Sequence, residues 1–184
     1  MSNSRRLSAA LLAATCSACL AIGASNPRPN VDLPRSTKVL ALQLEPAVSD
    51  AFTIPSRAGI RSAEVTGWRQ TLQAGFTNAF GSSYAPAGKG GKADLTLVII
   101  EADPALVAAS YRGSSATAVG CQLRYKAHLL DGTGQELGRS AATVESKTTT
   151  GDIGALSEIA GSAVETFYER VSADLFRAAP PAAK

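Results

Sequence analysis

The chain has 184 residues, of which 45% are hydrophobic and only 5% aromatic, which suits one domain with a core of small and β-branched side chains and argues against a second. The formal net charge is +3, and two of the basic residues are Arg5 and Arg6. Without the first 18 residues, 16 basic side chains stand against 15 acidic ones. This balance argues against a general nucleic-acid-binding protein, which needs a basic surplus to displace phosphate counterions.

The first residues have the pattern of a bacterial secretory signal. A short polar segment ends in Arg5 and Arg6, and an apolar run rich in alanine and leucine begins at Leu7. This run is too short and too weakly apolar for a good membrane-spanning helix, which requires about 20 strongly apolar residues. The mature protein is therefore expected outside the cytoplasm, either soluble or anchored to a membrane surface.

Two cysteines in the stretch TCSACL determine where this signal ends. A bacterial lipoprotein signal is cut directly before a cysteine whose thiol carries a diacylglycerol, and small residues precede that cysteine. Ser17 and Ala18 meet this requirement in front of Cys19, although Cys16 stands where leucine is usual. We therefore predict a lipoprotein signal peptide that ends before Cys19, and a Cys19 that is lipidated. Ordinary cleavage after Ala24 is the alternative, and it would discard both cysteines.

The other features of the cysteines and of the N-terminal segment fit this interpretation. The signal covers residues 1–18, and residues 19–36 are expected to be the lipidated N-terminus and a flexible tether, because they are rich in Pro, Asn, Ser and Arg. The Cys-x-x-Cys spacing is not expected to be a redox motif, since that motif opens a helix after a strand in a folded domain. The remaining cysteine, Cys121, is expected to be a small buried apolar residue.

The first half of the domain predicts one strand, one loop and one helix. Residues 38–45, KVLALQLE, are apolar and β-rich and end at Pro46, which predicts a strand. Residues 47–60 are expected to form a long loop. In residues 64–81, apolar side chains recur at spacings of three and four, which predicts an amphipathic helix that buries Trp68, Phe76 and Phe80.

The second half predicts three strands and a helix. Residues 93–103, ADLTLVIIEAD, are almost continuously apolar, which indicates a central strand. Residues 104–113 either extend this strand or leave it, and residues 114–120 are expected to be a flexible connection. From Val119 to Leu129 the chain alternates strictly, with apolar side chains on one face and Gln122, Arg124, Lys126 and His128 on the other.

The chain then turns back at DGTG, so residues 135–147 are expected to return as the second strand of a hairpin. Residues 152–177 carry one apolar stripe and predict a long helix, capped at its start by Asp152 or Thr150. The last residues, 179–184, are expected to be a disordered tail.

These elements predict an α+β fold of the order β-α-β-β-β-α. The β-α-β unit makes its two strands parallel, and the later strands join as hairpins. Both helices have one apolar stripe, so we expect a two-layer α/β sandwich in which a four-stranded mixed sheet carries two helices on one face. A single domain over residues 37–178 follows.

One group of residues is a candidate binding face. Arg124, Lys126 and His128 lie on one side of the predicted strand, about 7 Å apart, and Arg112 precedes them in the connecting loop. Such a face suits an anionic partner such as a lipid headgroup, a glycan phosphate or an acidic protein surface. The alternative is that these side chains only keep an exposed face soluble.

No enzyme, metal site or cofactor is predicted. The stretch GKGGK lacks the Ser or Thr that follows the lysine of a P-loop. His128 is the only histidine, and no nucleophile motif accompanies it. Asp94 and Asp103 lie at opposite ends of a predicted strand, too far apart to act on one substrate. Glu101 and Asp103 can share a face, but carboxylates at a strand end usually only meet water.

The signal with an acylatable Cys19, the order of elements and the hairpin LRYKAHLLDGTGQELGRSAATV resemble the small outer-membrane lipoproteins of Gram-negative bacteria. These include lipopolysaccharide-assembly lipoproteins and accessory lipoproteins of transport and secretion systems. The resemblance is architectural and covers Cys19 and residues 38–177.

The resemblance implies a non-enzymatic accessory or assembly subunit of an envelope protein complex. Such a subunit is held in the outer membrane by its lipid and faces the periplasm. The alternative is a soluble periplasmic binding module for a small or lipidic ligand, released by cleavage after Ala24.

Overall fold

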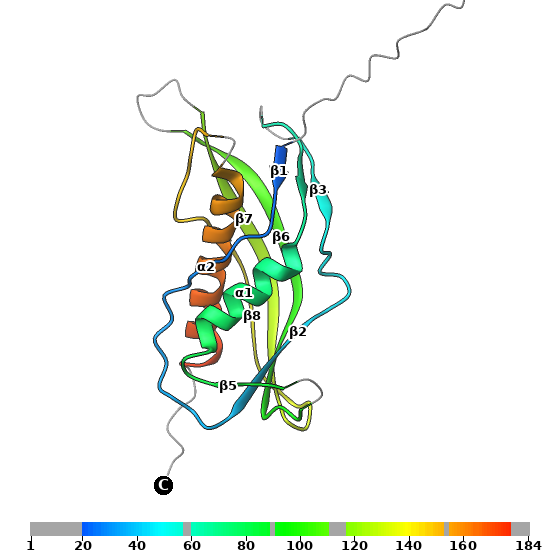
Figure 1. Ribbon diagram of the computed structural model, residues 1–184, viewed down its shortest axis with the longest axis vertical. Coiled ribbons are helices and arrows are strands. Elements are labelled where there is room, and N and C mark those ends of the chain that lie inside the picture. Colours follow the sequence, from blue (N-terminus) through cyan, green and yellow to red (C-terminus); the bar gives the residue numbers. More distant parts are fainter. Residues whose placement is uncertain (1–19, 57–59, 89–90, 111–116, 153–154, 178–184) are drawn as a thin grey trace, which may run out of the picture.

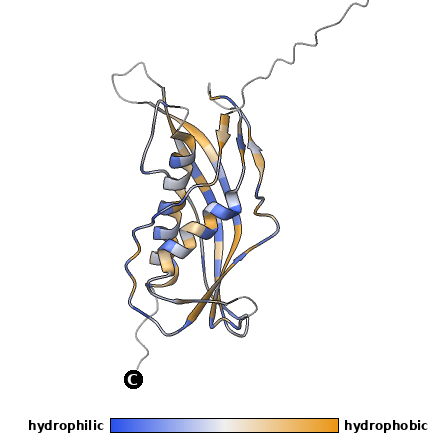
Figure 2. Ribbon diagram, in the orientation of Figure 1, coloured by the Kyte–Doolittle hydropathy of each residue, from blue (hydrophilic) through white to orange (hydrophobic). Residues whose placement is uncertain are grey.

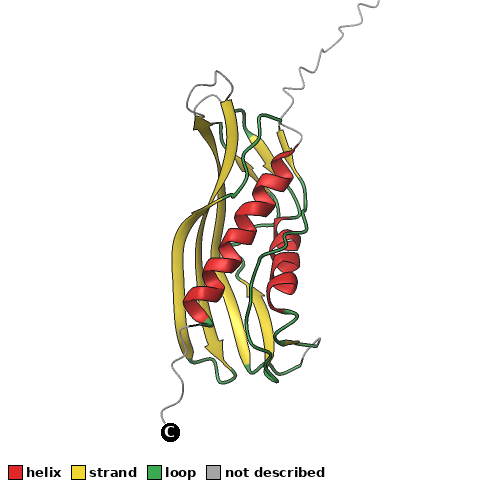
Figure 3. Cartoon of the chain, turned by 90° about the vertical axis from the view of Figure 1, so that its left-hand side faces the viewer, coloured by secondary structure: helices red, strands yellow, loops and turns green. Residues whose placement is uncertain are grey.

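The computed structural model describes residues 20–56, 60–88, 91–110, 117–152 and 155–177. The predicted signal peptide, Cys19, Arg112 and the tail 179–184 lie outside these residues. The elements are β1 (Leu20–Ile22), β2 (Val39–Leu44), β3 (Phe52–Ile54), β4 (Ala63–Val65), α1 (Trp68–Phe80), β5 (Ala85–Pro86), β6 (Leu95–Ser110), β7 (Thr117–Asp131), β8 (Glu136–Glu145) and α2 (Leu156–Leu175). They build an elongated molecule with both helices on one face of the main sheet (Figures 1 and 3).

The main sheet has five strands in the order β5-β2-β6-β7-β8. Strand β2 runs parallel to β6, and β6, β7 and β8 are joined as antiparallel hairpins. The four predicted strands are therefore β2, β6, β7 and β8, and the predicted mixed sandwich is confirmed. The difference from the expected four-stranded sheet is β5, a two-residue strand that pairs in parallel with the outer edge of β2.

Strands β6 and β7 form one long hairpin. Strand β6 continues through Pro104 to Ser110, and β7 already begins at Thr117, so residues 117–120 belong to a strand and not to the expected connection. Pro104 is tolerated because β2 pairs with β6 only as far as Ile99. Beyond that point β6 lacks its second neighbour in this sheet, and proline occurs where no partner strand needs its N–H.

The core lies between this sheet and the two helices. Cys121, Leu123, Tyr125 and Ala127 of β7 are buried towards the helices, as the alternation predicts. Hydrophobic and hydrophilic residues alternate along the long strands in Figure 2. The apolar stripe of α2 is also confirmed, with six of its seven predicted members buried and Leu175 partly buried: Leu156, Ala160, Ala163, Val164, Phe167 and Val171.

The two helices touch at Gly75, where α1 crosses Tyr168 of α2. A Cβ atom at Gly75 would lie 2.8 Å from the Tyr168 ring, so only glycine permits this approach. The buried Tyr168 hydroxyl donates to the Leu72 carbonyl at 2.7 Å, and burial raises the pKa of Tyr168 well above its ordinary value. Trp68 and Phe80 are buried as predicted, whereas Phe76 is only partly buried.

Three short strands form a second sheet in the order β1-β4-β3. Strand β3 lies inside the predicted loop 47–60, and β4 includes Glu64 and Val65, which were expected to begin the first helix. Helix α1 instead begins at Trp68, after Gly67 in the left-handed conformation (φ 70°). The last helix also begins later than expected, at Leu156, and its N-cap residue Ala155 makes no side-chain capping bond. No helix in the described part of the chain is both long and apolar enough to cross a membrane.

Candidate functional site

The predicted binding face is present on the sheet, but its cations are paired. Arg124, Lys126 and His128 all project from the solvent side of β7, on what we call the outer face. Glu101 contacts Arg124 Nε at 2.5 Å and Lys126 Nζ at 2.6 Å. His128 Nδ1 lies 2.8 Å from Oε2 of Glu136. The structure therefore brings the three predicted residues together and gives each of them a carboxylate partner.

Glu101 is the centre of this cluster. Its side chain is only 18% exposed, and the hydrogen bond from Lys126 lowers its pKa, with the positive charge of Arg124 lowering it further. Arg124 also contacts Asp103 at 3.0 Å, so two cations and two carboxylates share the cluster without net charge. Because an anionic partner is attracted by a net positive field, this pairing weakens the electrostatic case for the face. Its role with an anionic partner stays a prediction.

The segment expected to be a flexible tether is instead packed against the domain. We call residues 20–36 the N-terminal strap. Its first residues form β1, which pairs in parallel with β4, and Ile22 of this strand is only 2% exposed. The strap then passes over the two helices to the opposite end of the molecule, where it enters β2 (blue in Figure 1). The expectation of a flexible tether over these residues is therefore wrong.

Both helices hold the strap through its main chain. The backbone N–H of Ser25 donates to Oγ1 of Thr71 in α1 at 3.0 Å. On α2, the N–H groups of Arg28 and Asn30 donate to the carboxylates of Glu165 and Glu169 at 2.8 and 2.9 Å. Backbone amides that would otherwise meet water thus have fixed acceptors, and hydrogen bonds to charged groups are among the stronger ones.

At two positions the strap packs so closely on the domain that only glycine leaves enough space. A Cβ atom at Gly67, just before α1, would lie 2.9 Å from Cβ of Ala24. A Cβ atom at Gly161 in α2 would lie 2.8 Å from Oγ of Ser25. At its far end, the buried Ser83 hydroxyl donates to the Leu33 carbonyl at 2.9 Å. The helices are therefore shaped to receive this segment.

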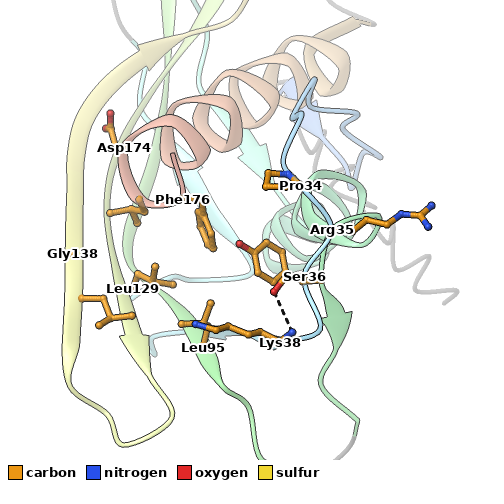
Figure 4. Close-up of a pocket in the computed structure, with 12 residues that line it drawn as sticks. Pro34, Arg35, Ser36, Lys38, Leu95, Leu129, Gly138, Asp174 and Phe176 are labelled. Atoms are coloured by element: carbon orange, nitrogen blue, oxygen red, sulfur yellow. Dashed lines mark hydrogen bonds between the residues drawn. The ribbon is translucent and has the colours of Figure 1, made fainter. Parts of the chain in front are cut away.

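A pocket of about 570 Å³ opens at the end where the strap meets β2. We call it the distal pocket. It lies between the strap, the C-terminal end of α2 and the ends of β6, β7 and β8 (Figure 4). Its volume falls in the range of small-molecule sites, about 300–1,000 Å³. Most of its lining is apolar or aromatic, from Tyr84, Leu95, Leu129, Leu137, Leu175 and Phe176.

The charged residues that line the distal pocket differ in their hydrogen-bond partners and in the direction of their side chains. Asp174 already accepts hydrogen bonds from Ser140 and Arg170, at 2.7 and 3.0 Å. In Figure 4 the Arg35 guanidinium points away from the pocket, whereas the Lys38 side chain extends across it towards Leu95. Lys38 Nζ makes no ion pair with any described residue. The pocket thus combines an apolar lining with one available cation.

Sequence reasoning missed this pocket, because its residues come from six separate segments. One signal was available. Leu137 lies two residues after the polar DGTGQ turn, and it is 54% exposed, more than any other large apolar side chain in the described residues. An exposed leucine next to a hairpin turn is a reason to look for a binding surface.

Cys121 lies where the sequence places it, fully buried in the core. Burial raises the pKa of its thiol to about 12, so the reactive thiolate is absent at ordinary pH. In a soluble protein that begins at Leu20, where Cys121 is the only cysteine, we expect a thiol reagent at about pH 8 to label the unfolded but not the native state. Mass spectrometry with and without denaturant measures this, and rapid labelling of the native protein would contradict the burial.

The described residues contain no group of three or more His, Cys, Asp or Glu side chains that could hold a metal ion. Asp94, one of the carboxylates weighed from the sequence, has a structural role, because Oδ2 accepts the backbone N–H of Val39 at 2.8 Å. Glu101 and Asp103 share the outer face and are engaged by Arg124.

No protein-family model and no curated protein matches this sequence. Among solved structures, protein XCC0632 of Xanthomonas campestris, of family model DUF330, has a similar fold, with a TM-score of 0.52 and 15% identity over 82% of this chain and 91% of that one. A minor lipoprotein of Acinetobacter baumannii gives a TM-score of 0.49 at 12% identity, with 82% and 99% covered. Uncharacterized lipoprotein B of Nitrosomonas europaea gives 0.42 at 15% identity, with 79% and 88% covered. The fold shared with XCC0632 agrees with the α+β architecture that the sequence predicts.

Proposed function

We propose that this chain is a non-enzymatic lipoprotein of the bacterial cell envelope, acylated at Cys19. It serves as an accessory or assembly subunit of an outer-membrane or transport complex. The outer membrane, with the domain facing the periplasm, is the proposed site of anchoring. Its expected partners are the membrane, through the lipid, and an envelope protein complex.

One observation carries the proposal. Strand β1 starts at Leu20, the residue after Cys19 in the sequence, it pairs with β4, and Ile22 is buried in the core. Cleavage after Ala24 would cut inside the strap and remove the whole of β1, while cleavage before Cys19 leaves every described residue in place. The packing of β1 against the domain therefore supports acylation at Cys19 over cleavage after Ala24.

The test is metabolic labelling with a palmitate analogue in a Gram-negative host. We expect label in the wild-type protein and in the matched control Cys16→Ala, because Cys16 leaves with the signal. The variant Cys19→Ala should carry no label and should leave the membrane fraction. Label that persists in Cys19→Ala, or an unlabelled wild-type protein beginning at Ser25, would refute the proposal. Co-purification from detergent-solubilised membranes then identifies the partner complex.

The distal pocket favours a second candidate function, the binding of a small lipidic ligand. The apolar lining suits an acyl chain, and Lys38 offers a cation to an anionic head. This function is compatible with either cleavage site, because neither removes a residue that lines the pocket.

A fluorescent fatty acid tests this second function. We expect Leu137→Asp to weaken its binding by about tenfold, because loss of a good apolar contact costs about 1.4 kcal/mol or more. Lys38→Ala should weaken binding of the carboxylate but not of the corresponding neutral alcohol. The control is Arg61→Ala, an exposed cation outside the pocket lining. Equal affinity in Leu137→Asp and the wild type would exclude this pocket as the ligand site.

A further inference from the structure

Strand β1 starts at the residue that follows the proposed acylation site in the sequence. The backbone N–H of Leu20 donates to the Ser62 carbonyl at 3.2 Å, and Leu20 is in register with Ala63 of β4. Cys19 is the residue before Leu20, and consecutive Cα atoms lie about 3.8 Å apart. A lipid on Cys19 is therefore joined to a paired strand by a single peptide bond.

Release of the strap to lengthen the tether is opposed by contacts along the strap. Ile22 is buried at its start, Glu165 and Glu169 accept its N–H groups in the middle, and the Leu33 carbonyl accepts the buried Ser83 hydroxyl near its end. To lengthen the tether by its first residues, β1 must separate from β4 and Ile22 must leave the core, and each further extension breaks the next of these contacts. Leu20, the residue bonded to the proposed anchor, is therefore held on the body of the domain.

The anchor point lies at one end of the elongated molecule. In Figure 1 the start of β1 is at the upper end, and β5 and the turn between β7 and β8 are at the lower end. Strand β6 runs between the two ends, and its 16 residues correspond to about 50 Å at ~3.3 Å per residue. The distal pocket includes Leu95, the first residue of β6, and therefore lies at the lower end.

We infer that the β1 end of the domain is a docking surface for the lipid bilayer, and that the distal pocket is held about 50 Å above the membrane. This inference rests on the proposed acylation of Cys19. Arg61, which is exposed and next to Ser62, is part of this surface, and its charge suits phosphate headgroups. A partner that uses the distal pocket must then approach from the side facing away from the membrane.

Fluorescence quenching in vesicles tests this orientation. The full acylated protein is reconstituted into phosphatidylcholine vesicles that contain a nitroxide-headgroup lipid. A fluorophore is attached through Arg61→Cys at the β1 end or through the matched control Gln135→Cys in the turn between β7 and β8; both positions are exposed. Buried Cys121 does not compete for the label. We expect quenching at position 61 to be several-fold stronger than at position 135.

A second variant tests whether the lipid is attached to the domain rigidly or through a flexible segment. A long Gly-Ser insertion between Cys19 and Leu20 leaves the strap intact and supplies a tether, so quenching at position 61 should fall towards that at position 135. Equal quenching at the two positions in the acylated, vesicle-bound protein would overturn the inference, as would an insertion without effect. Absence of acylation or of vesicle binding would instead refute the proposed function.

Discussion

Starting a soluble protein at Ser25 instead of Leu20 is expected to lower the free energy of unfolding by about 3 kcal/mol. The shorter protein is the product of cleavage after Ala24. It lacks β1, so the site of Ile22, which is 2% exposed in the longer protein, is left empty. It also loses the pairing of β1 with β4, whose other neighbour is β3. Loss of one large buried side chain and of a few backbone hydrogen bonds adds up to this cost.

Urea unfolding measures the difference, with the fluorescence of Trp68, the only tryptophan, as the probe. The matched control is Ala21→Ser in the longer protein, which changes the exposed residue of the same strand and should leave the midpoint unchanged. Equal midpoints for the two starting points would show that β1 contributes nothing to the fold. That result would also remove the observation that favours acylation at Cys19.

Trp68→Ala is expected to destabilise the protein by about 3–5 kcal/mol. Trp68 is 2% exposed and meets Phe52 of β3 edge to face, with ring centroids 6.3 Å apart. Its indole Nε1–H donates to the Ala102 carbonyl at 2.9 Å, on the part of β6 that lies beyond β2. Truncation therefore leaves a cavity where α1, β3 and β6 meet, and an unpaired buried carbonyl.

Trp68→Phe separates these two effects. Phenylalanine keeps most of the ring volume but cannot donate to Ala102, so we expect a smaller loss of about 1–3 kcal/mol. Far-ultraviolet circular dichroism in urea is the measurement, because both variants lack the tryptophan. If Trp68→Phe costs as much as Trp68→Ala, the hydrogen bond dominates, and if neither variant shifts the midpoint, the packing described for Trp68 is wrong.

The structural features that the sequence predicts correctly are those that depend only on residues close together in the sequence. Alternation from Val119 to Leu129 assigns each side chain of β7 to its correct face, and helical spacing identifies Trp68 and Phe80 as buried. Local spacing also explains one error. Glu64 and Val65 fit both a helix and a strand, and pairing of β4 with β1 decides for the strand. A window of sequence does not contain that partner.

The strap shows why composition misleads about tethers. Its prolines and polar residues are typical of a linker, yet Pro27 and Pro29 are buried. What orders the strap is a set of acceptors on the two helices, Thr71, Glu165 and Glu169, which lie 46 to 139 residues from their donors. The pattern of residues 20–36 contains no information about these acceptors. The docking of the strap could therefore not be predicted from this segment of the sequence.

The candidate sites were predictable in part for the same reason. Alternation places Arg124, Lys126 and His128 on one face, but their partners depend on how β6 and β7 are aligned. A register shift between Ile99 and Glu101 sets Glu101 opposite Lys126, and no local pattern specifies such an irregularity. The distal pocket needs the complete fold, because it forms where the strap, α2 and three strands come together.

The docked strap has a consequence for the order of folding. In the proposed lipoprotein, the chain leaves the cytoplasm N-terminus first, so the strap crosses the membrane before the helix that receives it. Gly23, Arg28 and Asn30 bond to partners 134, 137 and 139 residues further along. Contacts of such long sequence separation form slowly, because nearly the whole chain must be closed into a loop. Under the proposed export, the strap is therefore among the first parts of the domain to cross the membrane and among the last to fold, because it docks only after α2 has followed it.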